Sequence, residues 1–223
     1  MLVLHYTGMI DAASALARLT DPAAKVSAHY VIDEDGTIHR LVAEDRRAWH
    51  AGDACWRGAT DINGRSIGIE LVNPGHAFGY RPFPEVQVRA VIDLGLALVG
   101  RHPIPARNVV GHADVAPRRK EDPGELFDWR RLADHGLGLW PRQRPVTGEL
   151  GLALGPGDGD GAAAALQGAL ADFGYDVPTH GGYDTDTEAV VRAFQRHFRP
   201  ARVDGRADPE TAQLAFALQA MIG

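Results

Sequence analysis

The stretch from Val109 to Gly124 constrains the fold of this chain more than any other part of the sequence. It opens with two β-branched residues, which are typical of the end of a buried strand. The glycine, prolines and charged residues that follow predict a shaped loop, and this loop carries His112, Lys120 and Asp122. Asp122 follows His112 by ten positions, too far for one helical face. His112 at a strand end and Asp122 in the following loop have the pattern of two metal ligands. A zinc site in a hydrolase needs a third ligand and an open position for water.

Length and composition set the outer limits of the interpretation. A chain of 223 residues allows one large domain or two smaller ones. The net charge of −6 argues against a general nucleic-acid-binding protein. The single cysteine, Cys55, excludes an intrachain disulfide and leaves the cellular compartment open. No apolar run approaches the ~20 residues that span a bilayer, and the first residues do not form a signal peptide. We therefore expect no transmembrane segment.

Strand and helix patterns alternate through the first part of the chain. Strands are predicted at 2–7, 26–32, 37–42 and 66–73, and helices at 11–19 and 85–99. Asp11 or the preceding turn is the expected cap of the first helix, and Asp35-Gly36 is the expected hairpin turn. This alternation predicts an α/β domain over residues 1–140, with a mixed central sheet flanked by helices.

The composition changes after Pro141, and residues 141–161 are predicted to form a linker and a Gly/Asp-rich turn. Three helices are expected beyond it, at 162–173, 185–198 and 208–222. Thr185 and Glu188 have the spacing of a capping box, and Asp208-Pro209 has the pattern of an N-cap followed by a first-turn proline. Residues 162–223 are therefore predicted to form a separate, small three-helix domain.

The chain has ten histidines, and most of them need not be functional. His5 ends a predicted buried strand, and taken alone it would be a satisfied core histidine. His29 and His50 lie at a strand end or turn, where a cleft could form. The others besides His112 are expected at the surface or in ordinary hydrogen bonds. His39 lies on a predicted strand, and the rest are expected in loops or at helix ends, without acidic or histidine partners: His76, His102, His135, His180 and His197.

Glu70 stands in an otherwise apolar strand pattern. By alternation, Ile67, Ile69 and Leu71 share one face, and Glu70 shares the other with Gly68. Such a carboxylate is either a solvated residue on an open face or a catalytic base at the rim of a site.

Five segments in this order resemble the zinc-dependent N-acetylmuramoyl-L-alanine amidases of the type 2 family, which are relatives of phage amidases and peptidoglycan recognition proteins. The segments are Leu4–Thr7, Ser27–Tyr30, Ala48–Gly52, Ser66–Glu70 and Gly111–Gly124, and the resemblance covers about residues 1–140. The remainder resembles a three-helix peptidoglycan-binding domain through Leu166-Gln167, Phe173–Tyr175, Tyr183-Asp184, Ala193–Gln195 and Val203–Gly205.

The resemblance implies roles for five residues. His5, His112 and Asp122 would be the zinc ligands, with Asp122 replacing the cysteine of other branches. Glu70 would be the general base, and Lys120 would stabilise the developing oxyanion. The implied substrate is the amide between the lactyl group of N-acetylmuramic acid and L-alanine, in peptidoglycan or in muropeptides.

Four further residues are candidates for substrate contacts. Trp49 and His50 lie in a turn that could form one wall of the cleft. Arg65 could meet a stem-peptide carboxylate, although a plain surface role suits it equally well. Asn73 could hydrogen-bond the peptide backbone.

Three alternatives remain at this point. A non-catalytic peptidoglycan-binding protein on the same fold would be expected to lack a ligand, but all of the candidates are present. A cytoplasmic amidase restricted to soluble anhydro-muropeptides would not need a wall-binding domain, so we expect a periplasmic or cell-envelope location with an export signal that is absent from this sequence. The His-Glu-x-x-His motif of a helical zinc peptidase is absent.

Overall fold

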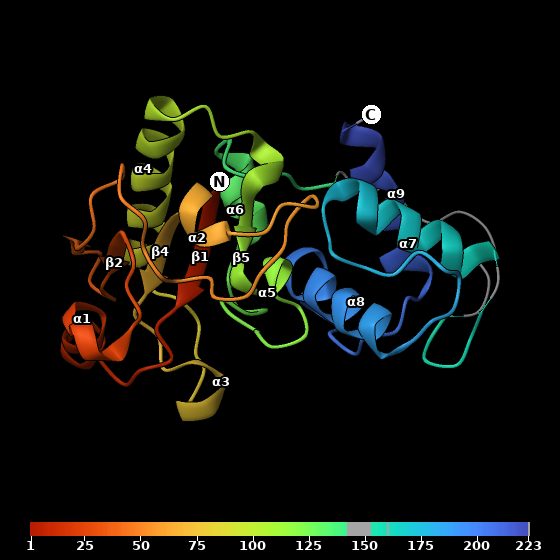
Figure 1. The fold of residues 1–223 in the computed structure, drawn as a ribbon, viewed down its shortest axis with the longest axis horizontal. Coiled ribbons are helices and arrows are strands. Elements are labelled where there is room, and N and C mark those ends of the chain that lie inside the picture. Colours follow the sequence, from red (N-terminus) through yellow and green to blue (C-terminus); the bar gives the residue numbers. More distant parts are fainter. Residues whose placement is uncertain (142–152, 160, 223) are drawn as a thin grey trace.

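The computed structural model describes residues 1–141, 153–159 and 161–222 of the chain. Figure 1 shows a unit built around a β-sheet and, beside it, a unit built of helices. Among the described residues, no helix combines the length and apolar character needed to cross a bilayer. The predicted linker at 141–161 falls largely outside the described part of the chain.

A five-stranded mixed sheet forms the centre of the first unit, as the alternating pattern predicted. Its order is β3-β2-β4-β1-β5, with β1, β2, β4 and β5 parallel and β3 antiparallel to β2 at one edge. The strands are β1 (Leu2–Tyr6), β2 (Tyr30–Ile32), β3 (Ile38–Arg40), β4 (Ile67–Leu71) and β5 (Val109–Gly111). Several are shorter than predicted because β2 and β3 pair over three residues only.

Helices cover the sheet, and the first of them starts where the local sequence favours it. In α1 (Ala12–Thr20) the carboxylate of Asp11 accepts a hydrogen bond from the Ser14 N–H, which confirms the predicted cap. The long helix α4 (Glu85–Arg101) packs on one face of the sheet (Figure 1). The remaining helices of this unit were not predicted because they are short, namely α2 (Ile62–Arg65), α3 (Gly75–Phe78), α5 (His112–Val115) and α6 (Trp129–Asp134).

The two faces of β4 differ as predicted. Ile67, Ile69 and Leu71 lie in the apolar core that the sheet forms with α4. Glu70 points to the opposite face, where the side chain is largely enclosed rather than standing on an open, solvated surface. The sheet therefore has one fully apolar face and one face that carries polar groups.

The helical unit consists of α7 (Gly161–Phe173), α8 (Thr185–Phe198) and α9 (Pro209–Ile222). The predicted cap of α9 is confirmed, because the Asp208 carboxylate accepts a hydrogen bond from the Thr211 N–H at 3.0 Å. The predicted cap of α8 is wrong by one residue. Asp184, not Thr185, is the N-cap, and its carboxylate accepts from the Thr187 N–H at 2.8 Å.

The sheet unit and the helical unit share one hydrophobic core. Trp56 of the first unit contacts the rings of Phe173 and Tyr175, with centroids 5.8 and 5.1 Å away. Val3 and Val110, on the face opposite to α4, belong to the same buried cluster. The helical unit is therefore packed against the β5 side of the sheet, beside α5 (Figure 1).

Gln87 provides a test of how this fold is held together. Its fully buried side-chain amide donates hydrogen bonds to the carbonyls of Ile32 and Val72, at 3.0 and 3.1 Å, and so ties the ends of β2 and β4 to α4. Gln87→Leu removes the Gln87 donor from the Val72 carbonyl, whereas the Ile32 carbonyl keeps its hydrogen bond from the Val72 N–H at 2.9 Å. We expect a loss of about 1–3 kcal/mol of unfolding free energy in denaturant titrations. Gln219→Leu, at a more exposed position on α9, should change it by less than about 0.5 kcal/mol. Equal changes in the two variants would contradict this account.

Candidate active site

Parallel pairing of three strands brings the polar candidates to one edge of the sheet. His5 near the end of β1 is the register partner of Glu70 on β4. On the other side of β1, Leu4 pairs with Gly111, and His112 follows directly at the start of α5. Because the carboxyl ends of parallel strands meet at the same edge, side chains that are far apart in sequence converge there.

His5, His112 and Asp122 form a tight, buried cluster. The Nδ1 atoms of the two histidines are 2.9 Å apart, and Asp122 Oδ2 lies 3.1 Å from His5 Nδ1 and 3.0 Å from His112 Nδ1. All three side chains are buried. Among the histidine, cysteine and carboxylate side chains of the described residues, this group lies close enough together to share a metal ion.

Backbone hydrogen bonds fold the loop that joins His112 to Asp122. The Ala113 N–H donates to the Asp122 carbonyl at 2.9 Å, which joins the start of the loop to its end. The Ala116 carbonyl accepts from the N–H groups of Arg119 and Lys120, both at 3.1 Å. The loop therefore doubles back on itself and brings Lys120 to the same pocket as the cluster.

The hydrogen bond behind His112 fixes where its proton lies. Its Nε2 is 3.0 Å from the carbonyl oxygen of Ala51, which can only accept. Nε2 therefore carries the proton, and in the neutral ring Nδ1 presents a lone pair to the cluster.

A longer relay fixes the proton of His5. The Ser66 hydroxyl donates to the Ile62 carbonyl and therefore accepts from His50 Nε2, at 3.2 Å. His50 Nδ1 is then an acceptor, so the His5 Nε2–H donates to it across 2.9 Å. This assignment leaves His5 Nδ1 as a lone pair that also faces the cluster.

Three electron-pair donors thus meet with no proton between them. His5 Nδ1, His112 Nδ1 and a carboxylate oxygen of Asp122 are mutually within 3.1 Å, and each would repel the others if nothing lay among them. Two imidazoles and one carboxylate form a common ligand set for a divalent metal ion. The residues present therefore fit a metal.

The protonation states at neutral pH suit metal binding as well. Burial, and then the neighbouring His112, lower the pKa of His5 to about 4. Burial by itself would raise the pKa of Asp122, but the two imidazoles beside it hold that pKa well below its usual value. A neutral imidazole and an ionised carboxylate are the forms that bind metal, so little proton release is needed at these two residues.

Glu70 and Lys120 complete the site with one acid–base group and one cation. Burial, followed by the nearby Asp122 carboxylate, raises the pKa of Glu70 well above its usual value, while Lys120 opposes that shift. Oε2 of Glu70 is buried without a hydrogen-bond partner among the described residues. For the ammonium of Lys120, the described part of the chain likewise offers no hydrogen bond or ion pair. Both groups are thus available to a reacting molecule.

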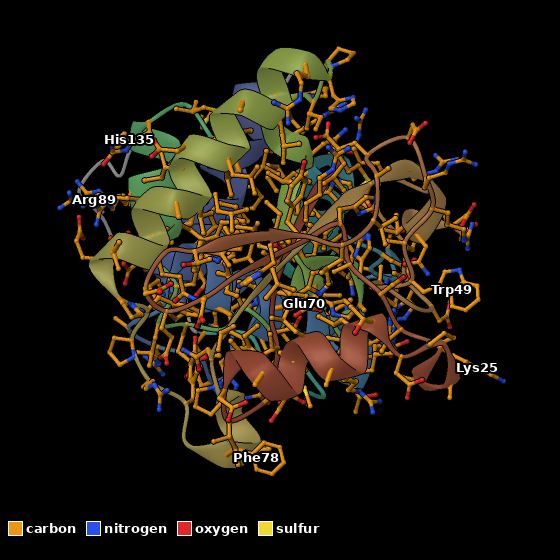
Figure 2. All side chains as sticks on the ribbon, turned by 90° about the vertical axis from the view of Figure 1, so that its left-hand side faces the viewer. Lys25, Trp49, Glu70, Phe78, Arg89 and His135 are labelled. Atoms are coloured by element: carbon orange, nitrogen blue, oxygen red, sulfur yellow. The ribbon has the colours of Figure 1, made fainter. Side chains whose placement is uncertain are left out.

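A pocket of about 300 Å³ gives access to this cluster. Met9, Leu19 and Val26 contribute apolar wall, and Trp49 stands at the rim with 52% of its surface exposed. In Figure 2, Glu70 lies in the interior of the molecule while Trp49 projects from its surface. The pocket therefore combines an apolar wall with a polar, partly charged floor.

The four predicted substrate contacts lie in different places. Trp49 and His50 line the pocket, although both ring nitrogens of His50 are engaged by His5 and Ser66. Arg65 ends α2 and lines a separate pocket beside the amino terminus. Asn73 is fully buried, and its side chain holds the loop after β4 through the Arg81 carbonyl and the Gly75 N–H, so the structure does not bring Arg65 or Asn73 to the cluster.

Sequence reasoning missed the support behind His5. Ser66 orients His50, and Gly68 makes room for the His50 ring, because a Cβ at position 68 would lie 2.5 Å from His50 Cγ. An isolated glycine within a strand pattern often marks such a close approach, and this was the available signal.

Fold and site together define a hydrolase with a candidate metal centre at the carboxyl edge of a mixed sheet. The family model "N-acetylmuramoyl-L-alanine amidase" matches residues 1–125, and the model "Putative peptidoglycan binding domain" matches residues 160–214. The chain belongs to the N-acetylmuramoyl-L-alanine amidase family and is an enzyme of that class.

Several relatives resemble the chain closely. It is 42% identical to N-acetylmuramoyl-L-alanine amidase AmiD of Escherichia coli, over 98% of this chain and 81% of AmiD. It is 39% identical to 1,6-anhydro-N-acetylmuramyl-L-alanine amidase AmpD of Enterobacter cloacae, over 57% of this chain and 66% of AmpD. A structure of E. coli AmiD with the substrate anhydro-N-acetylmuramic acid-L-Ala-D-γ-Glu-L-Lys matches with a TM-score of 0.84 and 40% identity, over 100% of this chain and 89% of that one. AmpDh3 of Pseudomonas aeruginosa matches with a TM-score of 0.83 and 32% identity, over 99% and 91%.

His50→Leu tests the relay behind His5. The variant removes the acceptor for the His5 Nε2–H and so frees that ring to turn. Loss of a group that orients a ligand typically weakens metal affinity 10–100-fold, and we expect a drop of about that size in competition titrations against a chelator. His39→Leu, on β3, should leave the affinity unchanged. Unchanged affinity in His50→Leu would show that His5 is oriented by other contacts.

Proposed function

We propose that the protein hydrolyses the amide between N-acetylmuramic acid and L-alanine in muropeptides or peptidoglycan, with zinc as its metal. The observation that carries the proposal is the convergence of three unprotonated donors, within 3.1 Å of one another, beside a buried glutamate with an unpartnered oxygen. Similarity to AmiD over 98% of the chain supports the choice of substrate.

The donor set supports zinc in particular. Zn²⁺ binds imidazole nitrogen and carboxylate oxygen at about 2.0–2.2 Å in tetrahedral sites, so neighbouring ligand atoms lie roughly 3.3 Å apart. The separations of 2.9–3.1 Å among His5, His112 and Asp122 are close to that value. Three protein ligands leave a fourth position open, as in catalytic rather than structural zinc sites. A zinc ion held there would polarise the amide carbonyl and lower the pKa of water toward ~7.

Glu70 is placed to move protons. It faces the cluster from β4, beside His5, and burial raises its pKa, which favours the carboxyl group in holding a proton that it has accepted. We assign to it the removal of a proton from the attacking water. It would then deliver that proton to the amine of L-alanine as the amide bond breaks.

Lys120 is placed to stabilise negative charge. Its ammonium reaches the pocket from the loop, two residues before Asp122, without an acceptor of its own in the described ranges. The carbonyl oxygen of the substrate becomes negatively charged when water adds to it. A fixed cation close to that oxygen stabilises the transition state more than the ground state.

The pocket walls suit a molecule with both sugar and peptide parts. Trp49, Met9 and Val26 offer apolar surface, and Arg18 adds a positive charge at the same pocket. We propose that the acyl-sugar side and the stem peptide lie along these walls on either side of the cluster. The match of residues 160–214 to a peptidoglycan binding domain supports attachment to polymeric wall, which would raise the local substrate concentration. It also supports our proposal of a cell-envelope location.

Glu70→Gln separates proton transfer from metal binding. The amide keeps the size of the carboxyl but cannot accept the proton, so we expect kcat to fall by about 10²–10⁴-fold with one metal ion still bound per chain. Turnover of a soluble muropeptide and metal content by mass spectrometry are the two measurements. Wild-type kcat in this variant would remove Glu70 from the mechanism.

Lys120→Ala tests the cation. We expect kcat to fall by ~10²–10³-fold with the metal retained, as for loss of one oxyanion-stabilising group. The chain has one other lysine, the exposed Lys25, and Lys25→Ala is a matched control that should keep the wild-type kcat. A Lys120→Ala protein that loses its metal would instead assign Lys120 a structural role.

Digestion of purified sacculi by zinc-loaded protein tests the function as a whole. We expect stem peptides that begin with alanine, identified by mass spectrometry, which disappear with a chelator and return with zinc. Zinc-loaded protein that cleaves neither sacculi nor soluble muropeptides would contradict the proposal and favour a binding protein on the same fold.

A further inference from the structure

The loop that carries His112, Lys120 and Asp122 is contacted along its length by the helical unit. Arg118 pairs with Asp176 and Asp186 of that unit, at 3.0 and 2.7 Å. The short helix α5, which begins at His112, packs directly on α8. The loop is therefore held between the sheet and the helical unit rather than standing free.

The central contact is made by Asp114, two residues after His112. Its carboxylate is almost completely buried, with 2% of the residue exposed. Oδ2 accepts hydrogen bonds from the Gly111 N–H and from His197 Nδ1, both at 2.7 Å, and Oδ1 accepts from the Tyr175 hydroxyl at 2.6 Å. Two of these three donors belong to the helical unit.

Both donors from the helical unit are themselves fixed. The His197 ring stacks on Trp129 of the sheet unit, with centroids 3.9 Å apart and planes 16° from parallel. Tyr175 packs edge-on against Trp56, at 5.1 Å. Burial, and then the Asp114 carboxylate, raise the pKa of Tyr175 well above its usual value, so it remains a hydroxyl donor.

A second contact reaches the other end of the loop. Arg196, the neighbour of His197 on α8, forms an ion pair with Glu121 at 2.6 Å, and Glu121 directly precedes Asp122. Half-exposed pairs of this kind contribute little stability. Their geometry nevertheless fixes the loop immediately beside a candidate ligand.

We propose that the helical unit positions the metal ligands, through Tyr175 and His197 on Asp114, in addition to any part it has in binding the cell wall. Without these donors a buried carboxylate would lose two of its three hydrogen bonds, which favours a shift of α5 that brings the carboxylate to other donors. His112 begins α5, so such a shift moves a ligand atom. Tyr175 and His197 are positioning residues, because they act through Asp114 and do not line the pocket. The inference rests on the proposed ligand role of His112.

A positioning role of the helical unit can be distinguished from wall attachment with a soluble substrate, because such a substrate needs no attachment to the wall. If the helical unit only attached the enzyme to the cell wall, impairing that unit would leave turnover of a soluble muropeptide unchanged. A positioning role lowers metal affinity and kcat on that same soluble substrate, with little change in KM.

Tyr175→Phe is the decisive variant, because it removes one hydroxyl and keeps the ring. In the full-length protein we expect zinc affinity, measured by chelator competition, to fall about tenfold. We expect kcat on a soluble N-acetylmuramoyl tripeptide to fall by a similar factor, with KM within about twofold. Tyr183→Phe is the matched control. Tyr183 is equally buried, and its hydroxyl donates to the Gly205 carbonyl inside the helical unit, so its loss should lower thermal stability without moving zinc affinity.

His197 gives a second, independent test, and phenylalanine at this position retains a ring that can stack on Trp129. His197→Phe removes the donor to Asp114 and should resemble Tyr175→Phe, whereas His197→Asn keeps a side-chain N–H and should recover part of the affinity. Wild-type zinc affinity and kcat in both Tyr175→Phe and His197→Phe would overturn the inference while leaving the proposed function intact. A wild-type protein that binds no zinc would overturn both.

Discussion

The rest of the site depends on three electron-pair donors that are forced to face one another. A buried imidazole lone pair gains nothing from pointing at another lone pair or at a carboxylate, and in isolation either ring would turn away. The rings cannot turn, because each is held from behind: His112 by the Ala51 carbonyl, and His5 by His50. The fold therefore maintains an arrangement that a cation among the donors would stabilise. Such local conflicts are typical of functional sites, where the surrounding structure supplies the compensating stability.

Strand pairing positions some residues of the site, and the folding of the loop positions the others. The register of β1 with β4 and β5 sets His5, Glu70 and the start of α5 at one edge, and the apolar core under α4 keeps that register. No strand carries Lys120 or Asp122. Their positions come from the backbone hydrogen bond between Ala113 and Asp122 and from the turn closed by the Ala116 carbonyl. The contacts of the loop with the helical unit hold it from the other side. The least regular part of the site is thus the part that both units of the molecule enclose.

Periodicity and local signals predicted much of this architecture. The alternation in β4 separated Glu70 from Ile69, and the cap signals placed α1 and α9 correctly. The resemblance to the amidase family, rather than periodicity, implied roles for His5, Glu70, His112, Lys120 and Asp122. All five line one pocket, and their catalytic and ligand roles are proposals.

Contacts between distant residues that no family motif covers were beyond the reach of the sequence. His197 was expected to lack an acidic neighbour, and this was wrong. Asp114, 83 positions away, meets it only because two units pack together. The link from His5 to Ser66 likewise runs through His50, which sequence reasoning placed at the substrate. Contacts of this kind join residues that are far apart in the chain, so the strand period of 2 and the helix period of 3.6 residues cannot predict them.

The most direct test of the central claim is X-ray absorption at the zinc edge of the metal-loaded protein. The account predicts one zinc ion per chain, with two imidazole nitrogens and the remaining ligands oxygen, and predicts that His5→Gln removes one imidazole from the spectrum. A third imidazole would show that His50 is a ligand rather than the support for His5. Absence of stoichiometric zinc at neutral pH would contradict the claim that these three donors form a metal site.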